Sequence, residues 1–168
     1  MAMTDAELLE RMQRFVPPTA DLLGQEVLEI NAEKGWVRMK FQPRAECCNP
    51  MGTVQGGIVV AMLDDAAAFA AIIKAGERIG VPTIELKASF FAPVPSGVPV
   101  YVEGRCIKLG KRIAFMEADM TDAAGKLLAR LSTSAVPLAM PTGSKLVERA
   151  ATTEQSARTA TTEQSERK

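Results

Sequence analysis

Two adjacent carboxylates, Asp64 and Asp65, end an almost wholly apolar stretch, NPMGTVQGGIVVAMLDD, which begins at Asn49. Carboxylates can activate a water molecule as general bases or attack a carbonyl carbon as nucleophiles. The chain contains no histidine, which excludes serine triads with a histidine base and metal sites built on imidazole. A cysteine nucleophile also usually needs a histidine partner. If this protein is an enzyme, carboxylates must carry the proton transfer or the attack.

The segment from Gly56 to about Ala75 is expected to form a helix, because its apolar residues recur at the i, i+3, i+4 spacing. The intervening positions are also apolar, which indicates a buried helix. Gly56 would lie at the helix N-terminus, where backbone N–H groups are free and the helix dipole is positive. A glycine there lets a substrate approach the backbone closely. The alternative is that Gly56 and Gly57 only permit a tight turn and close helix packing.

The two carboxylates are not equivalent on such a helix. Asp64 lies about 12 Å beyond Gly56 at ~1.5 Å per residue, which is too far to cap the helix. An inward-facing carboxylate is costly unless it is hydrogen-bonded or used. Asp65 is rotated by about 100° from Asp64, so both cannot point equally at one site. Before the helix, Asn49 is followed by Pro50, a pair that is typical of a turn.

The rest of the chain predicts an α+β fold. An amphipathic helix is expected from Thr4 to Phe15 and a short helical turn at Thr19–Leu23, followed by a β-hairpin within residues 25–43. Four strand-like runs follow the central helix. They are separated by breaks that hold Pro93, Pro95, Gly97, Gly110 and residues 122–125, and these predict an antiparallel meander. The runs are residues 82–94, 98–110, 112–122 and 126–139.

One sheet cannot cover a helix that is apolar on every side, so a second copy of the chain is expected to bury the rest. We divide the chain into three parts. These are an N-terminal helical segment (1–23), a domain with the sheet wrapped around the central helix (24–141), and a polar tail (142–168) in which ATTEQSAR nearly recurs as ATTEQSER. The tail is expected to be disordered because it has no apolar periodicity.

Composition excludes several classes of protein. The 168 residues include 20 basic and 20 acidic side chains, and this balance argues against a nucleic-acid partner. No apolar run is long enough, at ~18 residues without charge, to predict a membrane span. The N-terminus does not resemble a signal peptide, so a cytoplasmic location is expected. The three cysteines, two of them adjacent, are expected to be reduced thiols.

The spacing of Asn49, Gln55, Gly56-Gly57 and Asp64 resembles the hotdog-fold acyl-CoA thioesterases of the phenylacetyl-CoA type. The resemblance continues in TIELKASFFAPV and in KLGKRIAFMEADMTDAAGKLLARLSTSAV, and it covers roughly residues 20 to 138. It implies a hotdog fold, with an antiparallel sheet around one long helix, and a homodimer or homotetramer. It also implies hydrolysis of an acyl-CoA to a free acid and coenzyme A, with no other cofactor and no metal.

The resemblance assigns roles to individual residues. The Gly56 N–H would polarise the thioester carbonyl, and Asp64 would act as base or nucleophile across a dimer interface. Asn49 would orient the thioester or the water. Substrate-binding roles would fall to the residues Gln55, Gly57, Thr83, Lys108, Lys111 and Arg112, the last three against the phosphates of coenzyme A. Those three cations also suit an ordinary solvated turn.

The sequence departs from the family at Gln55, where the family usually has a histidine that chiefly positions the loop. Glutamine can make the hydrogen bonds but cannot titrate near neutral pH. A hotdog protein that binds acyl-CoA without hydrolysing it is therefore the alternative function. A related dehydratase would need a catalytic histidine, and a transcriptional regulator would need a helix-turn-helix segment. Asp65 is expected at the interface, and Phe69, Phe90 and Phe91 in the core.

Overall fold

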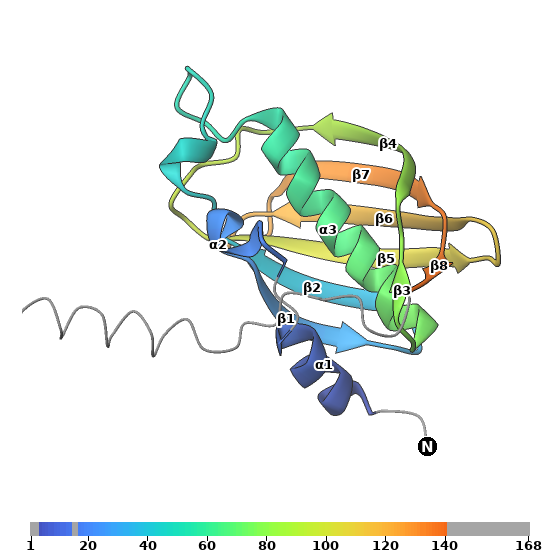
Figure 1. Cartoon of the computed structure of the whole chain (residues 1–168). Coiled ribbons are helices and arrows are strands. Elements are labelled where there is room, and N and C mark those ends of the chain that lie inside the picture. Colours follow the sequence, from blue (N-terminus) through green and yellow to red (C-terminus); the bar gives the residue numbers. More distant parts are fainter. Residues whose placement is uncertain (1–3, 15–16, 141–168) are drawn as a thin grey trace, which may run out of the picture.

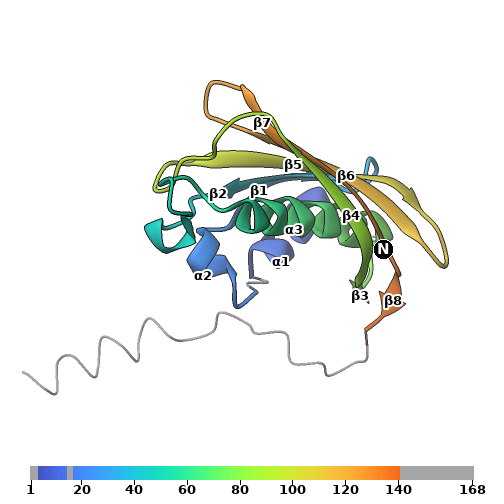
Figure 2. The same cartoon turned by 90° about the horizontal axis from the view of Figure 1, so that it is seen from above.

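The computed structural model describes residues 4–14 and 17–140 of the chain. A six-stranded antiparallel sheet curves around one long helix, α3, which crosses its concave face, and two short strands form a second antiparallel sheet (Figures 1 and 2). This is the α+β architecture that the sequence predicts. The helical elements are α1 (Asp5–Arg14), α2 (Ala20–Leu23), the short 3-10 helix η1 (Ala45–Cys47) and α3 (Gly56–Ala75). The strands are β1 (Glu26–Asn31), β2 (Trp36–Phe41), β3 (Ile79–Gly80), β4 (Thr83–Phe90), β5 (Val100–Leu109), β6 (Ala114–Thr121), β7 (Leu127–Ala135) and β8 (Leu138–Ala139).

Helix α3 begins at Gly56, the residue at which the sequence places its start, and it ends at Ala75, before Gly76. One side of the helix packs against the centre of the sheet, where Met62, Leu63 and Ala66 are fully buried. The approach is close at Gly104 of β5, because a Cβ atom there would lie 2.1 Å from the carbonyl oxygen of Ala66. A glycine is therefore required at this point of contact between helix and sheet.

The opposite side of α3 is not buried within one chain. Gly57 and Ala61 are exposed, and Asp64 and Ala68 are half-buried. By length and composition alone α3 could cross a membrane. Half of its apolar segment, however, is buried inside this fold, as in the core helix of an ordinary folded domain. Helix α3 is apolar on all sides, but the sheet of one chain covers only part of it, so one side of the helix stays open.

The strand order is β1-β2-β5-β6-β7-β4, and this corrects the predicted meander. Strands β5, β6 and β7 do form a meander, but β4 pairs with β7 instead of β5. The segment between β4 and β5 is a crossover, not a hairpin, and its backbone bonds elsewhere. The carbonyl of Val94 accepts from the N–H of Val54 (2.9 Å), and the N–H of Gly97 donates to Pro43 (2.8 Å). These bonds hold the crossover that leads from β4, at one edge, to β5, in the middle of the sheet.

The two edges of the large sheet differ. At the β1 edge, α1 packs against the strand and its residues Leu8 and Met12 join the core. Helix α1 is closed at its start by reciprocal bonds between Thr4 and Glu7, which is a capping box. At the other edge, β4 has the sheet on one side only, and Figure 1 shows no helix of the described residues along its free side. The protected edge is therefore β1 and the open edge is β4.

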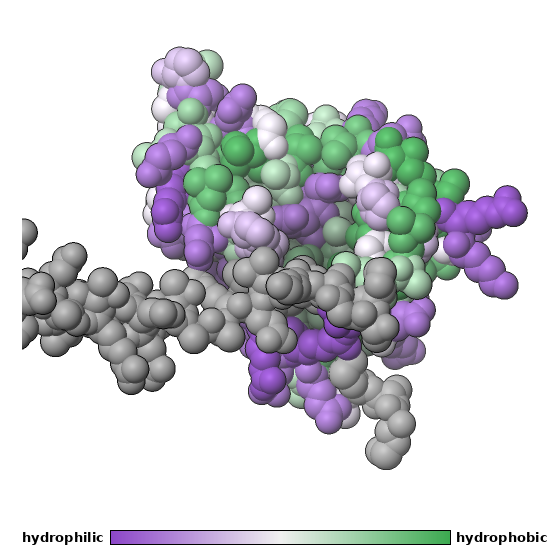
Figure 3. All heavy atoms as spheres, in the orientation of Figure 1, coloured by the Kyte–Doolittle hydropathy of each residue, from purple (hydrophilic) through white to green (hydrophobic). Residues whose placement is uncertain are grey.

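Apolar side chains of the β4 edge are exposed. Leu86 is 41% exposed and Phe90 is 54% exposed, and apolar surface gathers over α3 and β4 in Figure 3. The prediction that Phe90 and Phe91 belong to the core is wrong, since Phe91 is 57% exposed. The reason is the pairing of β4, because a strand at the edge has no neighbour to cover its last residues. Phe69 of α3 is buried as predicted.

Candidate active site

The N-terminus of α3 presents free backbone donors. Gln55 precedes the helix in extended conformation, and its carbonyl accepts from the N–H groups of Ile58 (2.9 Å) and Val59 (3.1 Å). Among the described residues, the N–H groups of Gly56 and Gly57 have no backbone or capping side-chain acceptor. These two donors and the positive end of the helix dipole can stabilise negative charge that develops on a carbonyl oxygen.

The side chain of Gln55 is exposed and makes no cap to the helix. The backbone of Gln55 does the positioning, because its N–H donates to the carbonyl of Cys47 at 2.9 Å. The start of α3 is thus fixed by main-chain bonds that do not depend on the residue type at position 55.

Asp64 lies on the open side of α3 and is half-buried. The hydroxyl of Thr83, the first residue of β4, donates to its carboxylate, with distances of 3.4 Å to Oδ1 and 3.2 Å to Oδ2. Burial raises the pKa of Asp64, and the Thr83 hydrogen bond opposes this rise. The structure therefore brings together two residues that the sequence singles out, Asp64 and Thr83, although the second half of α3 and the short strand β3 lie between them in the chain.

Asp65 is the more strongly perturbed of the two carboxylates. Burial, together with the negative charge of Asp64, raises the pKa of Asp65 to about 6. No hydrogen-bond donor or cation reaches its carboxylate from residues 4–14 or 17–140. Asp65 thus carries a cost that Asp64 partly avoids through Thr83.

Asn49 is occupied by its own turn. Its Oδ1 accepts from the N–H of Met51 (2.9 Å), and its Nδ2 donates to the hydroxyl of Thr53 (3.1 Å). The backbone of Gly52 closes the same turn on the carbonyl of Asn49 at 3.0 Å. In this chain Asn49 acts as a turn residue, and the turn leads directly into Gln55 and Gly56.

One chain does not bring all the predicted site residues together. Gly56 and Asp64 are about 12 Å apart along the helix axis, so they cannot both touch one thioester within a protomer. Lys108, Lys111 and Arg112 are exposed at the β5–β6 hairpin. This hairpin lies near the Ala75 end of α3, away from Gly56 (Figure 1).

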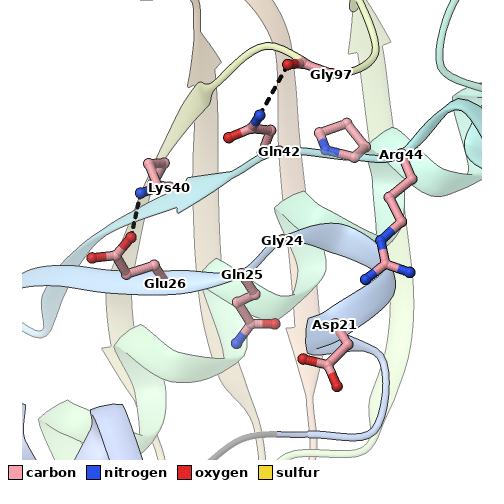
Figure 4. A pocket seen from close by; sticks show the side chains of 9 residues that line it. Asp21, Gly24, Gln25, Glu26, Lys40, Gln42, Arg44 and Gly97 are labelled. Atoms are coloured by element: carbon pink, nitrogen blue, oxygen red, sulfur yellow. Dashed lines mark hydrogen bonds and ion pairs between the residues drawn. The ribbon is translucent and has the colours of Figure 1, made fainter.

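A polar pocket that the sequence did not predict lies beside α2 (Figure 4). Lys40 pairs with Glu26 in it, and Gln42 donates to the carbonyl of Gly97 at 2.9 Å. The Oε1 of Gln25 is buried and has no hydrogen-bond partner within the described part of the chain. Among the described residues no cluster of three or more His, Cys, Asp or Glu side chains could hold a metal ion, and Cys47, Cys48 and Cys106 are free thiols.

Nothing in the sequence connects Phe90 with Gly56, but the fold brings the Phe90 ring next to the start of α3. Phe90 Cζ lies 3.4 Å from the position that a Cβ atom on Gly56 would occupy, and Cε1 lies at 3.7 Å. The only signal in the sequence is that Phe90 ends the strand after the central helix. The pairing of β4 with β7 brings it to the helix start.

Comparisons with known proteins agree with this architecture. Residues 51–129, from the loop before α3 into β7, match the thioesterase superfamily. Human acyl-coenzyme A thioesterase 13 is 28% identical over 130 residues, which are 77% of this chain and 84% of the relative. The candidate esterase SSO1253 of Saccharolobus solfataricus is 34% identical over 124 residues, 74% of this chain and 77% of the relative.

A solved structure from Ralstonia eutropha, a candidate thioesterase described as related to phenylacetic acid degradation, superimposes with a TM-score of 0.69. It is 27% identical, and the match covers 76% of this chain and 98% of that one. The sheet wrapped around α3 is thus the hotdog fold that the sequence resemblance implies. The chain belongs to the thioesterase superfamily and is a thioester hydrolase.

Proposed function

We propose that the protein is an acyl-CoA thioesterase whose active site forms between two copies of the chain. One observation carries the proposal. A single α3 bears free N–H donors at Gly56 and a hydrogen-bonded carboxylate of raised pKa at Asp64, too far apart to serve one substrate in one chain. An antiparallel pair of chains removes this problem, because the start of one α3 then meets the middle of the other.

The open edge of the sheet supports such a dimer. Strand β4 has unpaired backbone groups on one side, and Ile84, Leu86 and Phe90 are between 41% and 55% exposed. An edge strand with exposed apolar side chains is a template for pairing with another chain. In an antiparallel pair of β4 with its copy, Phe90 at the end of one strand lies near Thr83 at the start of the other. Gly56 of one protomer then faces Asp64 of its partner.

The chemistry follows from these groups. The Gly56 N–H binds the thioester oxygen, and negative charge on this oxygen grows as the tetrahedral intermediate forms. Asp64 either takes a proton from the attacking water or attacks the carbonyl carbon itself. In the first route the carbon–sulfur bond breaks, the thiolate of coenzyme A takes the proton, and the acyl group leaves as the free acid. In the second route the carbon–sulfur bond breaks as an anhydride forms between the acyl group and Asp64, and a water molecule then hydrolyses this anhydride to the free acid and the carboxylate. Thr83 holds the Asp64 carboxylate in orientation.

Other predicted residues have supporting roles in this proposal. Asn49 shapes the loop that presents Gln55 and Gly57. Because the hairpin with Lys108, Lys111 and Arg112 lies at the Thr83 end of the molecule, the dimer places the partner's hairpin on the side where coenzyme A must lie. The reaction needs no cofactor other than the coenzyme A of its substrate. We place the enzyme in the cytoplasm.

The first experiment is a thiol-release assay over a panel of acyl-CoAs with the wild type, Asp64→Asn and Asp65→Asn. Loss of a general base costs about 100- to 10,000-fold, so Asp64→Asn should lose turnover by this factor. Asp65→Asn should keep most of it. Full turnover in Asp64→Asn would refute the mechanism. Tight acyl-CoA binding without hydrolysis by the wild type would select the binding protein instead.

A complementation experiment tests the shared site. Gly56→Val crowds the Phe90 ring, which lies 3.4 Å from the Cβ position, and blocks the oxyanion donor of its own chain. Co-expression of Gly56→Val with Asp64→Asn chains gives mixed dimers in which one of two sites is intact. We expect about a quarter of wild-type activity from a statistical mixture of dimers. Activity no higher than that of the single variants would show that each site belongs to one chain.

A further inference from the structure

The ring of Phe90 borders the place where the thioester carbonyl is proposed to bind. It reaches Gly56 from β4, and the nearest ring atoms lie 3.4 Å and 3.7 Å from the Cβ position of that glycine. Apart from the chain neighbours of Gly56, no other side chain of the described residues comes within 4 Å of this position. The Phe90 ring therefore borders the space beside the Gly56 Cα.

The ring is also available to a substrate. Phe90 is 54% exposed, so more than half of its surface is not covered by its own chain. On the same face of β4 lie Leu86, which is 41% exposed, and Ala88, which is half-buried. We call Leu86, Ala88 and Phe90 the β4 apolar strip. The strip leads away from Gly56 along the inner face of the sheet edge.

The apolar character of the β4 apolar strip indicates which part of the substrate lies against the Phe90 ring. A carbonyl carbon bound at Gly56 carries the acyl chain on one side and the sulfur of coenzyme A on the other. The charged phosphates of coenzyme A favour solvent and cations, whereas an acyl chain favours apolar surface. The acyl chain thus follows the β4 apolar strip, and the carbon next to the carbonyl lies against Phe90.

We propose that Phe90 determines specificity at this carbon, and that its ring excludes acyl groups that carry a methyl branch next to the carbonyl. The inference rests on the proposed function. The 3.4 Å between the ring and the Gly56 Cβ position leaves room for one carbon atom beside the helix start, so a further substituent on that side presses against the ring. One methyl group more or less in an apolar pocket changes kcat/KM by about 10- to 200-fold.

The test uses pairs of acyl-CoAs that differ by one methyl at the carbon next to the carbonyl, such as octanoyl-CoA with 2-methyloctanoyl-CoA and phenylacetyl-CoA with 2-phenylpropionyl-CoA. The quantity measured is the ratio of kcat/KM for the unbranched over the branched member. We expect a ratio of at least about 10 in the wild type. Phe90→Ala and Phe90→Leu should lower the ratio towards 1, and the alanine variant should lower it further.

Phe91→Ala is the matched control. Phe91 is the next residue and is as exposed as Phe90, but it does not reach the Gly56 Cβ position within 4 Å. Its removal should leave the ratio within about twofold of the wild type, a difference well below that of one methyl group. Circular dichroism of each variant establishes that the fold is kept.

The outcomes separate the inference from the proposed function. If the wild type hydrolyses thioesters and Asp64→Asn does not, but the ratio is near 1 in the wild type or unchanged in both Phe90 variants, the inference fails and the proposed function stands. The inference also fails if Phe91→Ala lowers the ratio as much as the Phe90 variants do. If the wild type releases no thiol from any acyl-CoA of the panel, both fail together.

Discussion

Replacing Asp65 by asparagine should stabilise the protein at neutral pH. The carboxylate is half-buried on α3 beside Asp64, and no donor or cation from the described residues compensates its charge. Asparagine has nearly the same shape and no charge. The change therefore removes the cost of a charged Asp65 in the folded state without opening a cavity.

The magnitude follows from the pKa. Burial and the charge of Asp64 raise the pKa of Asp65 from 3.8 to about 6, and each pKa unit corresponds to about 1.36 kcal/mol. The charged form of Asp65 therefore costs the folded state about 3 kcal/mol. Well below pH 3.8 both states hold the proton and nothing is lost. As the pH rises from 3.8 to about 6, the unfolded chain releases the proton while the folded chain still holds it, so stability falls, and the full cost persists above that range.

The assay is urea unfolding of the wild type and Asp65→Asn at several pH values from 4 to 8. Protomer concentration must be held constant, because oligomerisation changes apparent stability. We expect the two proteins to differ little at pH 4. At pH 7.5 the variant should be more stable by about 2 to 4 kcal/mol. Glu117→Gln, which removes an exposed carboxylate from the outer face of β6, should show no such gain.

Asp64→Asn supplies a second check, because the charge of Asp64 contributes to the raised pKa of Asp65. In the Asp64→Asn background the gain from Asp65→Asn should shrink and its midpoint should move to lower pH. The reasoning is refuted if Asp65→Asn is no more stable than the wild type at pH 7.5. It is equally refuted if the stability difference does not depend on pH between 4 and 6.

Two further changes have effects that the structure specifies. Gly104→Ala places a Cβ atom 2.1 Å from the carbonyl oxygen of Ala66, so we expect a loss of about 2 kcal/mol or more in urea unfolding. Gly57→Ala, with nothing within 4 Å of its Cβ position, should be neutral or stabilising, and an equal loss there would contradict the steric reason. Thr83→Val removes a hydrogen bond that lowers the pKa of Asp64, so the acid limb of the kcat/KM profile should move to higher pH. Thr83→Ser should restore the wild-type profile, and an unmoved limb in Thr83→Val would show that Asp64 does not set it.

Features that depend on local sequence were predictable. The start of α3 at Gly56 follows from two glycines placed before an apolar helical repeat, and the β1–β2 hairpin follows from alternation around a short polar turn. Helix geometry alone predicts that Asp64 and Asp65 point in different directions and cannot have the same role. These inferences need only the neighbours along the chain, and the structure agrees with them.

Features that depend on pairing between distant segments were not predictable. Regular breaks after β4 suggested a hairpin to β5, but the segment bonds to Val54 and Pro43 instead. This single difference moves β4 to the sheet edge, exposes Phe90 and brings it against Gly56. The raised pKa of Asp65 likewise depends on the segments that pack around α3, and these cannot be predicted from the residues next to it in the sequence.

The start of α3 also explains how the site can tolerate glutamine in place of the family's histidine. The main chain of Gln55 is held by its N–H bond to Cys47 and by the two helical N–H groups that its carbonyl accepts, while its side chain caps nothing. The Gly56 donor is therefore positioned by bonds that survive any side chain at position 55. With no imidazole in the chain, Asp64 and Asp65 are the acidic groups of raised pKa at this helix. In the proposed mechanism a carboxylate sets the acid limb of activity, and we expect Thr83 to adjust it because its hydrogen bond lowers the pKa of Asp64.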